Sequence, residues 1–147
     1  EIGAGLNGGS RDRRRRSCYR RFGETVGLAF QIVDDLFDYL ADPEVTGKPV
    51  GSDLAEGKVT LPLIAALRQA GAADRRRLRR LALRKRLTAE QWSQLKSLVE
   101  TCGGFEYARA RALTHADAAR RILDGEPDGA ARQALDRAVD YAVRRDH

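Results

Sequence analysis

Apolar residues recur every three or four positions through most of the chain, with polar residues between them. This spacing is typical of amphipathic helices, whose apolar side chains share one face. No stretch alternates apolar and polar residues over the length of a strand. The pattern therefore predicts an all-α fold, with helices over residues 23–40, 60–70, 72–86, 88–102, 105–123 and 128–145. Tyr107 is expected on the packing face of the helix over residues 105–123, and Ala138 on the inward face of the helix over residues 128–145.

Prolines and capping residues mark the ends of these helices. Pro43 is expected to end the helix over residues 23–40, because proline lacks a backbone N–H and restricts the residue before it. Thr88-Ala89-Glu90-Gln91 has the spacing of a capping box, in which the first and last side chains bond to each other's backbone N–H. Residues 43–57, rich in glycine and charged side chains, are expected to form a loop.

Glycines predict two further features of the N-terminal region. The first ten residues contain the run Gly-Ala-Gly-Leu-Asn-Gly-Gly, so we expect them to be flexible, with a helix starting at Ser10 or Asp12. Gly23 and Gly27, four positions apart, are expected to let a neighbouring helix approach closely.

The helix over residues 23–40 carries two distinct faces. At about 100° per residue, four polar side chains fall within an arc of roughly 100°. These are Gln31, Asp34, Asp35 and Asp38. The opposite side carries an apolar stripe of Ala29, Val33, Leu36 and Leu40. Burial of that stripe would leave the three carboxylates facing a cavity or solvent.

Three carboxylates on one face repel one another and weaken the helix, so a cation should compensate them. A hard divalent ion such as Mg²⁺ suits carboxylate oxygens and fills the rest of its shell with water and substrate phosphate. The alternative is a merely solvated acidic face. Gln31 on the same face, and Lys48 and Lys58 in the glycine-bearing sequence that follows, favour a site for a phosphorylated ligand.

These residues carry a family resemblance. FQIVDDLFDY, followed by TGKPVGSDLAEGKVTLPLI, resembles the second aspartate-rich motif and the downstream loop of the trans-type isoprenyl (polyprenyl) diphosphate synthases. The similarity extends over almost the whole chain. It implies a helical bundle of the isoprenoid (class I terpenoid) synthase type. It also implies a Mg²⁺-dependent prenyltransferase that condenses an allylic diphosphate with isopentenyl diphosphate.

The resemblance also implies a role for each residue of the site. Asp34 is expected to bind Mg²⁺ directly, with Asp35 and Asp38 acting through water or behind it. Gln31 is expected to orient a phosphate or a metal-bound water. Lys48 is expected to contact the allylic diphosphate, and Lys58 to help close the loop. Asp53 matches the family's loop aspartate, although a turn or N-cap carboxylate is an equal interpretation.

Residues 1–147 resemble only the C-terminal half of this family's helical domain. The first aspartate-rich motif, which belongs to the other half, is not in the sequence, so the bundle is incomplete and we expect no activity from this chain alone. Family members are usually homodimers. The alternatives are a short subunit, or a related class I terpenoid enzyme, that completes its site with another chain.

Charge and composition limit the remaining function classes. The net charge is +6, yet residues 23–60 hold eight acids against two lysines, while residues 61–100 hold ten bases against three acids. A non-catalytic basic helical module that binds polyanions is thus possible, but the acidic block argues against nucleic acid. Two widely spaced cysteines and no apolar run of membrane-spanning length predict a cytoplasmic protein without a transmembrane segment.

Overall fold

The computed structural model describes residues 5–41, 51–84 and 86–144, with side chains from residue 12 onward. The elements are α1 (Gly5–Leu40), α3 (Ser52–Ala55), α4 (Leu61–Gln69), α5 (Ala72–Ala82), α6 (Ala89–Thr101), α7 (Gly104–Ile122), the 3-10 turn η1 (Leu123–Gly125) and α8 (Ala130–Val143). These described segments contain no strand, so the all-α prediction is confirmed.

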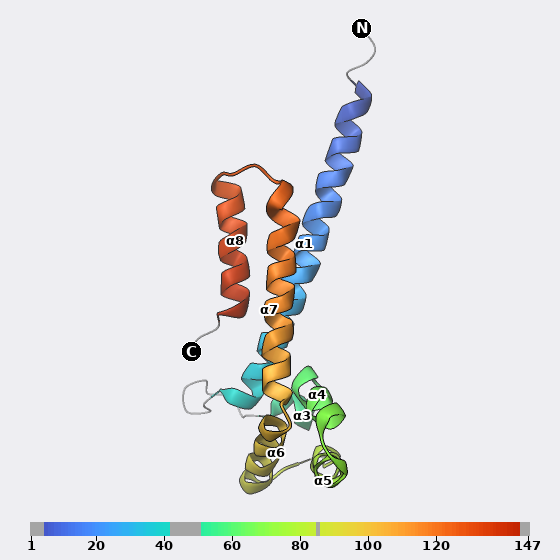
Figure 1. Ribbon diagram of the computed structural model, residues 1–147, viewed down its shortest axis with the longest axis vertical. Coiled ribbons are helices and arrows are strands. Elements are labelled where there is room, and N and C mark those ends of the chain that lie inside the picture. The colour runs from blue at the N-terminus through green and yellow to red at the C-terminus, as the bar shows by residue number, and fades with distance from the viewer. Residues whose placement is uncertain (1–4, 42–50, 85, 145–147) are drawn as a thin grey trace.

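Helices α1 and α7 lie side by side and form the long axis of the molecule, with α8 packed on both of them (Figure 1). The short helices α3, α4, α5 and α6 gather at one end, around the C-terminal part of α1. Alanines three or four residues apart line the buried face of α7, namely Ala108, Ala112, Ala116 and Ala119. Small side chains on a contact face let two helix backbones approach closely.

Two hydrophobic clusters hold the bundle together. The larger lies at the end where the short helices gather and joins α1 to α4, α5, α6 and α7 through side chains such as Leu36, Leu63, Leu78 and Leu95. The smaller joins α1 to α7 and α8 around Phe22, Leu123 and Val139. The predicted apolar stripe of α1 is buried at Ala29, Val33 and Leu36 and half-buried at Leu40.

The N-terminal residues differ from the sequence prediction. Helix α1 begins at Gly5 and runs unbroken to Leu40, whereas the glycine-rich start was expected to be flexible. An established helix extends at little cost, because each further residue adds one hydrogen bond and nucleation is already complete. The arginine-rich stretch after Ser10 consists of good helix formers, so the helix continues through the glycines that precede it.

The close helix approach also lies elsewhere than predicted. A Cβ on Gly23 or Gly27 would meet nothing within 4 Å. At Gly104, the first residue of α7, a Cβ would collide with the carbonyl oxygen of Pro62 in α4 and with Val99. The prediction for the α1 glycines was therefore wrong, and Gly104 is the position where the absent side chain allows contact.

Several smaller predictions also fail or succeed for identifiable reasons. Tyr107 was expected to face inward but is 42% exposed, because the alanine face of α7 turns it away from the core. Ala138 of α8 is likewise exposed.

The capping box at the start of α6 is confirmed. The Thr88 hydroxyl accepts from the Gln91 backbone N–H, and the Gln91 amide oxygen accepts from the Thr88 backbone N–H.

Within the described residues, no helix has both the length and the apolar character needed to cross a bilayer.

Candidate functional site

The C-terminal part of α1 presents the acidic face that the sequence predicts. Val33 and Leu36 point into the core, which leaves the polar face turned toward α3 and α4. Asp34 is exposed, as is Gln31, whereas Asp35 and Asp38 are half-buried. The three carboxylates thus share a face but differ in their surroundings.

Asp38 holds the start of α3. Its Oδ1 accepts hydrogen bonds from the Ser52 backbone N–H at 3.0 Å and from the Ser52 hydroxyl at 2.7 Å, and its Oδ2 accepts from the Asp53 backbone N–H at 3.3 Å. The Gly51 N–H also donates to the Asp38 carbonyl oxygen at 3.1 Å. A carboxylate at this position satisfies N–H groups that have no partner within the helix. Asp38 therefore fixes α3 against α1 across the intervening chain.

Asp35, on α1, faces the start of α4. Partial burial raises the pKa of Asp35 above its usual 3.8, and the charges of Asp53 and Asp34 act in the same direction. Hydrogen bonds from the Gln31 amide, at 3.0 Å, and from the Leu61 backbone N–H oppose this shift. Desolvation and like charges disfavour the ionised form. The surroundings of Asp35 would therefore favour a bound cation.

Lys58 closes the turn after α3. Its ammonium lies 2.8 Å from Glu56 Oε2 and 2.9 Å from Asp53 Oδ1. The hydrogen bonds to Glu56 and Asp53 raise the pKa of Lys58, although its side chain is 57% exposed. Lys58 is thus engaged with acids on its own turn. Lys48, the other predicted lysine, lies outside the described residues.

An aromatic cluster packs in the core next to Asp38. Tyr39 is only 2% exposed, stacks on Trp92 with ring centroids 5.3 Å apart, and meets Phe105 edge-on at 5.6 Å. Burial raises the pKa of Tyr39 to about 12. Gly51 has a φ of +74°, and a Cβ there would lie 2.6 Å from the Trp92 ring. Tyr39 is therefore a packing residue of the core.

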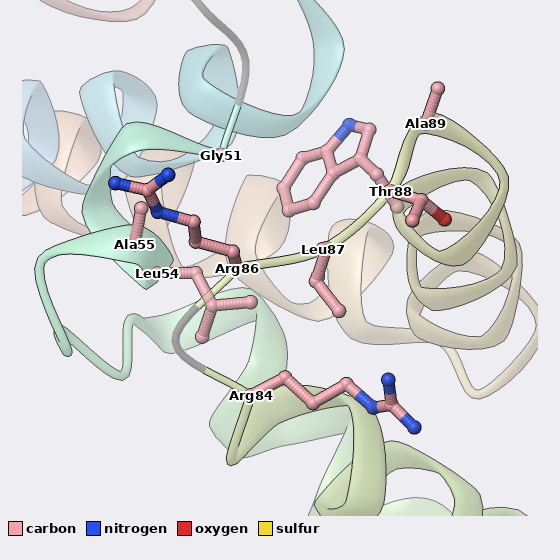
Figure 2. Close-up of a pocket in the computed structure, with 9 residues that line it drawn as sticks. Gly51, Leu54, Ala55, Arg84, Arg86, Leu87, Thr88 and Ala89 are labelled. Carbon is pink, nitrogen blue, oxygen red and sulfur yellow. The ribbon is translucent and has the colours of Figure 1, made fainter.

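A pocket of about 360 Å³ lies beside α3, between it and the segment that leads into α6 (Figure 2). Leu54 and Leu87 give it apolar walls, and Arg84 and Arg86 also line it. In Figure 2 the guanidinium of Arg86 points toward Ala55 and that of Arg84 points away from it. The two arginines therefore do not converge on one point.

Sequence reasoning missed two contributors to the site, Ser52 and the α3 helix itself. Ser52 is a donor to Asp38, from 14 residues further along the chain. The Gly-Ser-Asp sequence at the start of α3 was the available signal, because serine and aspartate favour helix N-termini.

The donor set fits a hard divalent cation. Within the described residues, no group of three or more acidic, histidine or cysteine side chains is close enough to hold a metal unaided. Magnesium, however, usually takes only one or two carboxylates and completes its shell with water and phosphate. Asp34 and Asp35, adjacent on α1, could supply those oxygens, while Asp38 already accepts three hydrogen bonds.

Comparison with known proteins identifies the family. The family model for polyprenyl synthetases matches residues 1–101. The chain belongs to this family. The short chain isoprenyl diphosphate synthase of Methanothermobacter thermautotrophicus is 40% identical over all 147 residues of the chain, which cover 44% of that protein. The octaprenyl diphosphate synthase of Escherichia coli is 39% identical over 125 residues, 85% of this chain and 38% of that one.

Solved structures of polyprenyl synthases show the same all-α isoprenoid synthase fold. The polyprenyl synthase of Caulobacter crescentus, crystallised with calcium and isoprenyl diphosphate, superposes with a TM-score of 0.79 at 33% identity, covering 88% of this chain and 39% of that one. The geranylgeranyl pyrophosphate synthetase of Pyrococcus horikoshii gives 0.80 at 30% identity, with the same two coverages. The chain spans less than half the length of the relatives it matches.

Proposed function

We propose that this polyprenyl synthetase chain supplies the diphosphate-binding half of a Mg²⁺-dependent prenyltransferase. The observation that carries the proposal is the acidic face of α1, where Asp34 is exposed and Asp35 is half-buried with a raised pKa. Related polyprenyl synthases support it, because that of Caulobacter crescentus was crystallised with calcium and isoprenyl diphosphate. The substrates would be an allylic diphosphate and isopentenyl diphosphate.

The reaction breaks the bond between the allylic carbon and the diphosphate oxygen, which leaves with the electron pair. The double bond of isopentenyl diphosphate then attacks the allylic carbon, and the new carbon–carbon product loses a proton. A bound Mg²⁺ would stabilise the charge that develops on the leaving oxygen. Asp34 and Asp35 would hold the metal, with Gln31 orienting Asp35 through its hydrogen bond. Asp38 would keep α3 and its turn beside them.

The two lysines would act on the diphosphate side of the site, and Asp53 would act through Lys58. Lys48 would contact the allylic diphosphate directly, and Lys58 would help to close the turn. Asp53 bonds to Lys58 and contributes its backbone N–H to Asp38. This geometry favours a role for Asp53 in positioning that turn.

An assay on the natural polypeptide tests the proposal. We expect Mg²⁺-dependent incorporation of labelled isopentenyl diphosphate into a longer prenyl diphosphate, and loss of that product when a chelator is added. Absence of both product and Mg²⁺-dependent diphosphate binding would contradict the proposal.

Mutation of Lys48 tests the assignment of the allylic subsite. A hydrogen bond to a charged partner contributes about 1.5–3 kcal/mol, so Lys48→Ala should raise the KM for the allylic substrate by roughly tenfold or more. The KM for isopentenyl diphosphate should change less, and an equal effect on both substrates would contradict the assignment. Lys58→Ala is the matched control, with a smaller expected effect because Lys58 is already bound to Asp53 and Glu56.

A second arrangement is that this chain is a short subunit which completes its site with another chain. The chain matches at most 44% of the length of these two relatives, so the other half of the site would come either from the same polypeptide or from a second chain. The intact mass of the natural polypeptide separates the two arrangements. In the single-chain arrangement we propose a cytoplasmic homodimer, and the molecular mass in solution tests that assembly state.

A further inference from the structure

Helix α5 has a strongly basic outward face. At about 100° per residue, Arg76, Arg79, Arg80 and Leu83 fall within an arc of roughly 100° on the side opposite the core. The core side is formed by Leu78 and Leu81, which are both buried. All four outward side chains are exposed. We call these four residues the α5 outer face.

Other arginines on α5 have structural partners. Arg75 donates to the carbonyl oxygens of Leu67, Arg68 and Ala70 at 2.7–3.3 Å and so holds the end of α4. Arg77 lies 3.6 Å from Asp74. The three outer-face arginines make no ion pair with any residue in the described part of the chain, and their positive charge is therefore not neutralised there.

Leu83, the apolar residue of the α5 outer face, is unusually exposed. Leu83 is 85% exposed, more than any other large apolar side chain among the described residues. It follows directly on α5, and the exposed Arg84 and Arg86 come after it. Basic side chains that attract anionic headgroups and an exposed apolar side chain that can enter the acyl boundary are two features of segments that bind at a membrane interface.

We infer that the α5 outer face docks on an anionic lipid bilayer. Arginines next to a membrane surface are attracted by acidic headgroups, and Leu83 would enter the acyl boundary between them. A nucleic acid would be held by the arginines alone, and no aromatic side chain lies on this face to stack on bases. Helix α5 lies at the same end of the molecule as α3, α4 and the acidic face of α1 (Figure 1). The inference does not rest on the proposed function.

Vesicle sedimentation of the natural polypeptide tests the docking. Vesicles of phosphatidylcholine mixed with phosphatidylglycerol should bind the protein, whereas phosphatidylcholine alone should bind it far less, and added salt should weaken binding. Each basic residue at an anionic surface contributes about fivefold to the partition coefficient. The triple variant Arg76→Gln, Arg79→Gln, Arg80→Gln should therefore bind roughly a hundredfold less.

A matched charge control is available on α7. Arg109, Arg111 and Arg121 are exposed and form no ion pair with the described residues. Their triple glutamine variant removes the same net charge and should bind anionic vesicles within a few fold of wild type. An equal loss in both triple variants would mean that only net charge matters, and would overturn the assignment to α5.

The apolar contact is tested separately. Leu83→Ser should weaken vesicle binding by about tenfold, on the scale of burying one leucine side chain, and this loss should persist at higher salt. Leu113→Ser on α7, where the leucine is 55% exposed, is the control and should have no effect.

Three further results would overturn the inference. They are equal binding to neutral and anionic vesicles, wild-type binding by the α5 triple variant, and tighter binding to duplex DNA than to anionic vesicles. The last result would identify nucleic acid as the partner. Circular dichroism should confirm that each variant keeps its helical content, so that a loss of binding is not a loss of fold.

Discussion

The carboxylates at the α8 end of the α1–α7 pair have different partners from the half-buried carboxylates of α1 at the other end. At the end with α8, carboxylates are paired with arginine. Arg120 lies 3.1 Å from Asp117 and 2.6 Å from Asp140. Glu126 accepts from Arg15 at 3.2 Å and from the Tyr19 hydroxyl at 2.9 Å.

At the other end, the half-buried carboxylates of α1 have no such partner within the described residues. Asp35 accepts from an amide and a backbone N–H, and Asp38 from two backbone N–H groups and a hydroxyl. The chain has 27 basic residues, so pairing was chemically available. Neutral donors stabilise a carboxylate without cancelling its charge. Asp35 and Asp38 therefore keep a negative charge that the described residues do not neutralise, as the proposed cation site requires.

The largest effect should come from Asp34→Ala. Loss of a direct metal ligand should lower kcat/KM by about a thousandfold, on the scale of removing one strong transition-state stabilising group. The free energy of unfolding should stay close to wild type, because Asp34 is exposed. Mg²⁺ with diphosphate should raise the Tm of the wild type but not of the variant.

The control for Asp34 lies at the opposite end. Asp117→Ala removes a carboxylate that is also exposed and that pairs with Arg120, and it should leave turnover unchanged. Near-normal turnover of the Asp34 variant would show that Asp34 is not a metal ligand. The exposed carboxylates at the two ends would then be equally dispensable for the reaction.

The next largest effect is on stability. Asp38→Ala removes the acceptor for the start of α3 and should lower the free energy of unfolding by about 1–2 kcal/mol, the range of lost helix caps. Urea unfolding measures this loss. Ser52→Ala removes one of the three hydrogen bonds and should cost less.

Combining the two changes sharpens this test. Because Asp38 and Ser52 bond directly, their double variant should be less destabilised than the sum of the single variants. Strict additivity would mean that Asp38 does not hold α3. In that case the role that the family resemblance implies for Asp38, support of the metal through water or from behind it, would be the better interpretation.

The sequence could predict what depends on local spacing. The acidic and apolar faces of α1 follow from the 3.6-residue period alone, and the Thr88 capping box from a four-residue pattern. The family resemblance correctly identified the fold and the family. These features need no knowledge of which helix packs on which.

Contacts between distant segments could not be predicted. Asp38 meets Ser52 only because the intervening chain returns to α1, and Tyr39 stacks on Trp92 from more than fifty positions away. The same limit explains the error at Tyr107, because its exposure depends on which face of α7 the alanines turn toward α1. Periodicity defines faces but does not say which neighbour each face will meet.

A smaller effect is expected at the arginine-paired end. Arg120→Met breaks the pairs with Asp117 and Asp140 while keeping much of the side-chain length. Since both acids and Arg120 itself are about two-fifths exposed or more, the loss should be about 0.5 kcal/mol. Urea unfolding at low and high salt checks this value, which should shrink as salt screens the pairs. A loss as large as that of Asp38→Ala would show that the ion pairs stabilise the helix contacts as strongly as the neutral donors do.

The smallest effect, and the only one of opposite sign, should come from Asp35→Asn. The pKa of Asp35 is raised on folding, so the folded state binds more protons than the unfolded state between the two pKa values, and stability falls as pH rises through that interval. At neutral pH the ionised carboxylate therefore destabilises the fold. Asparagine keeps an oxygen that can accept from Gln31 and Leu61 but carries no charge, so the variant should be slightly more stable than wild type at neutral pH.

That advantage should disappear as pH approaches and passes below 3.8, the usual pKa of this carboxyl, where the wild type is also protonated. Urea unfolding across this pH range measures the difference. Mg²⁺-dependent diphosphate binding should be weakened in the same variant. The carboxylate of Asp35 would then lower the stability of the fold and strengthen ligand binding at the same time. A variant that is less stable at neutral pH would instead give Asp35 the same structural role as Asp38.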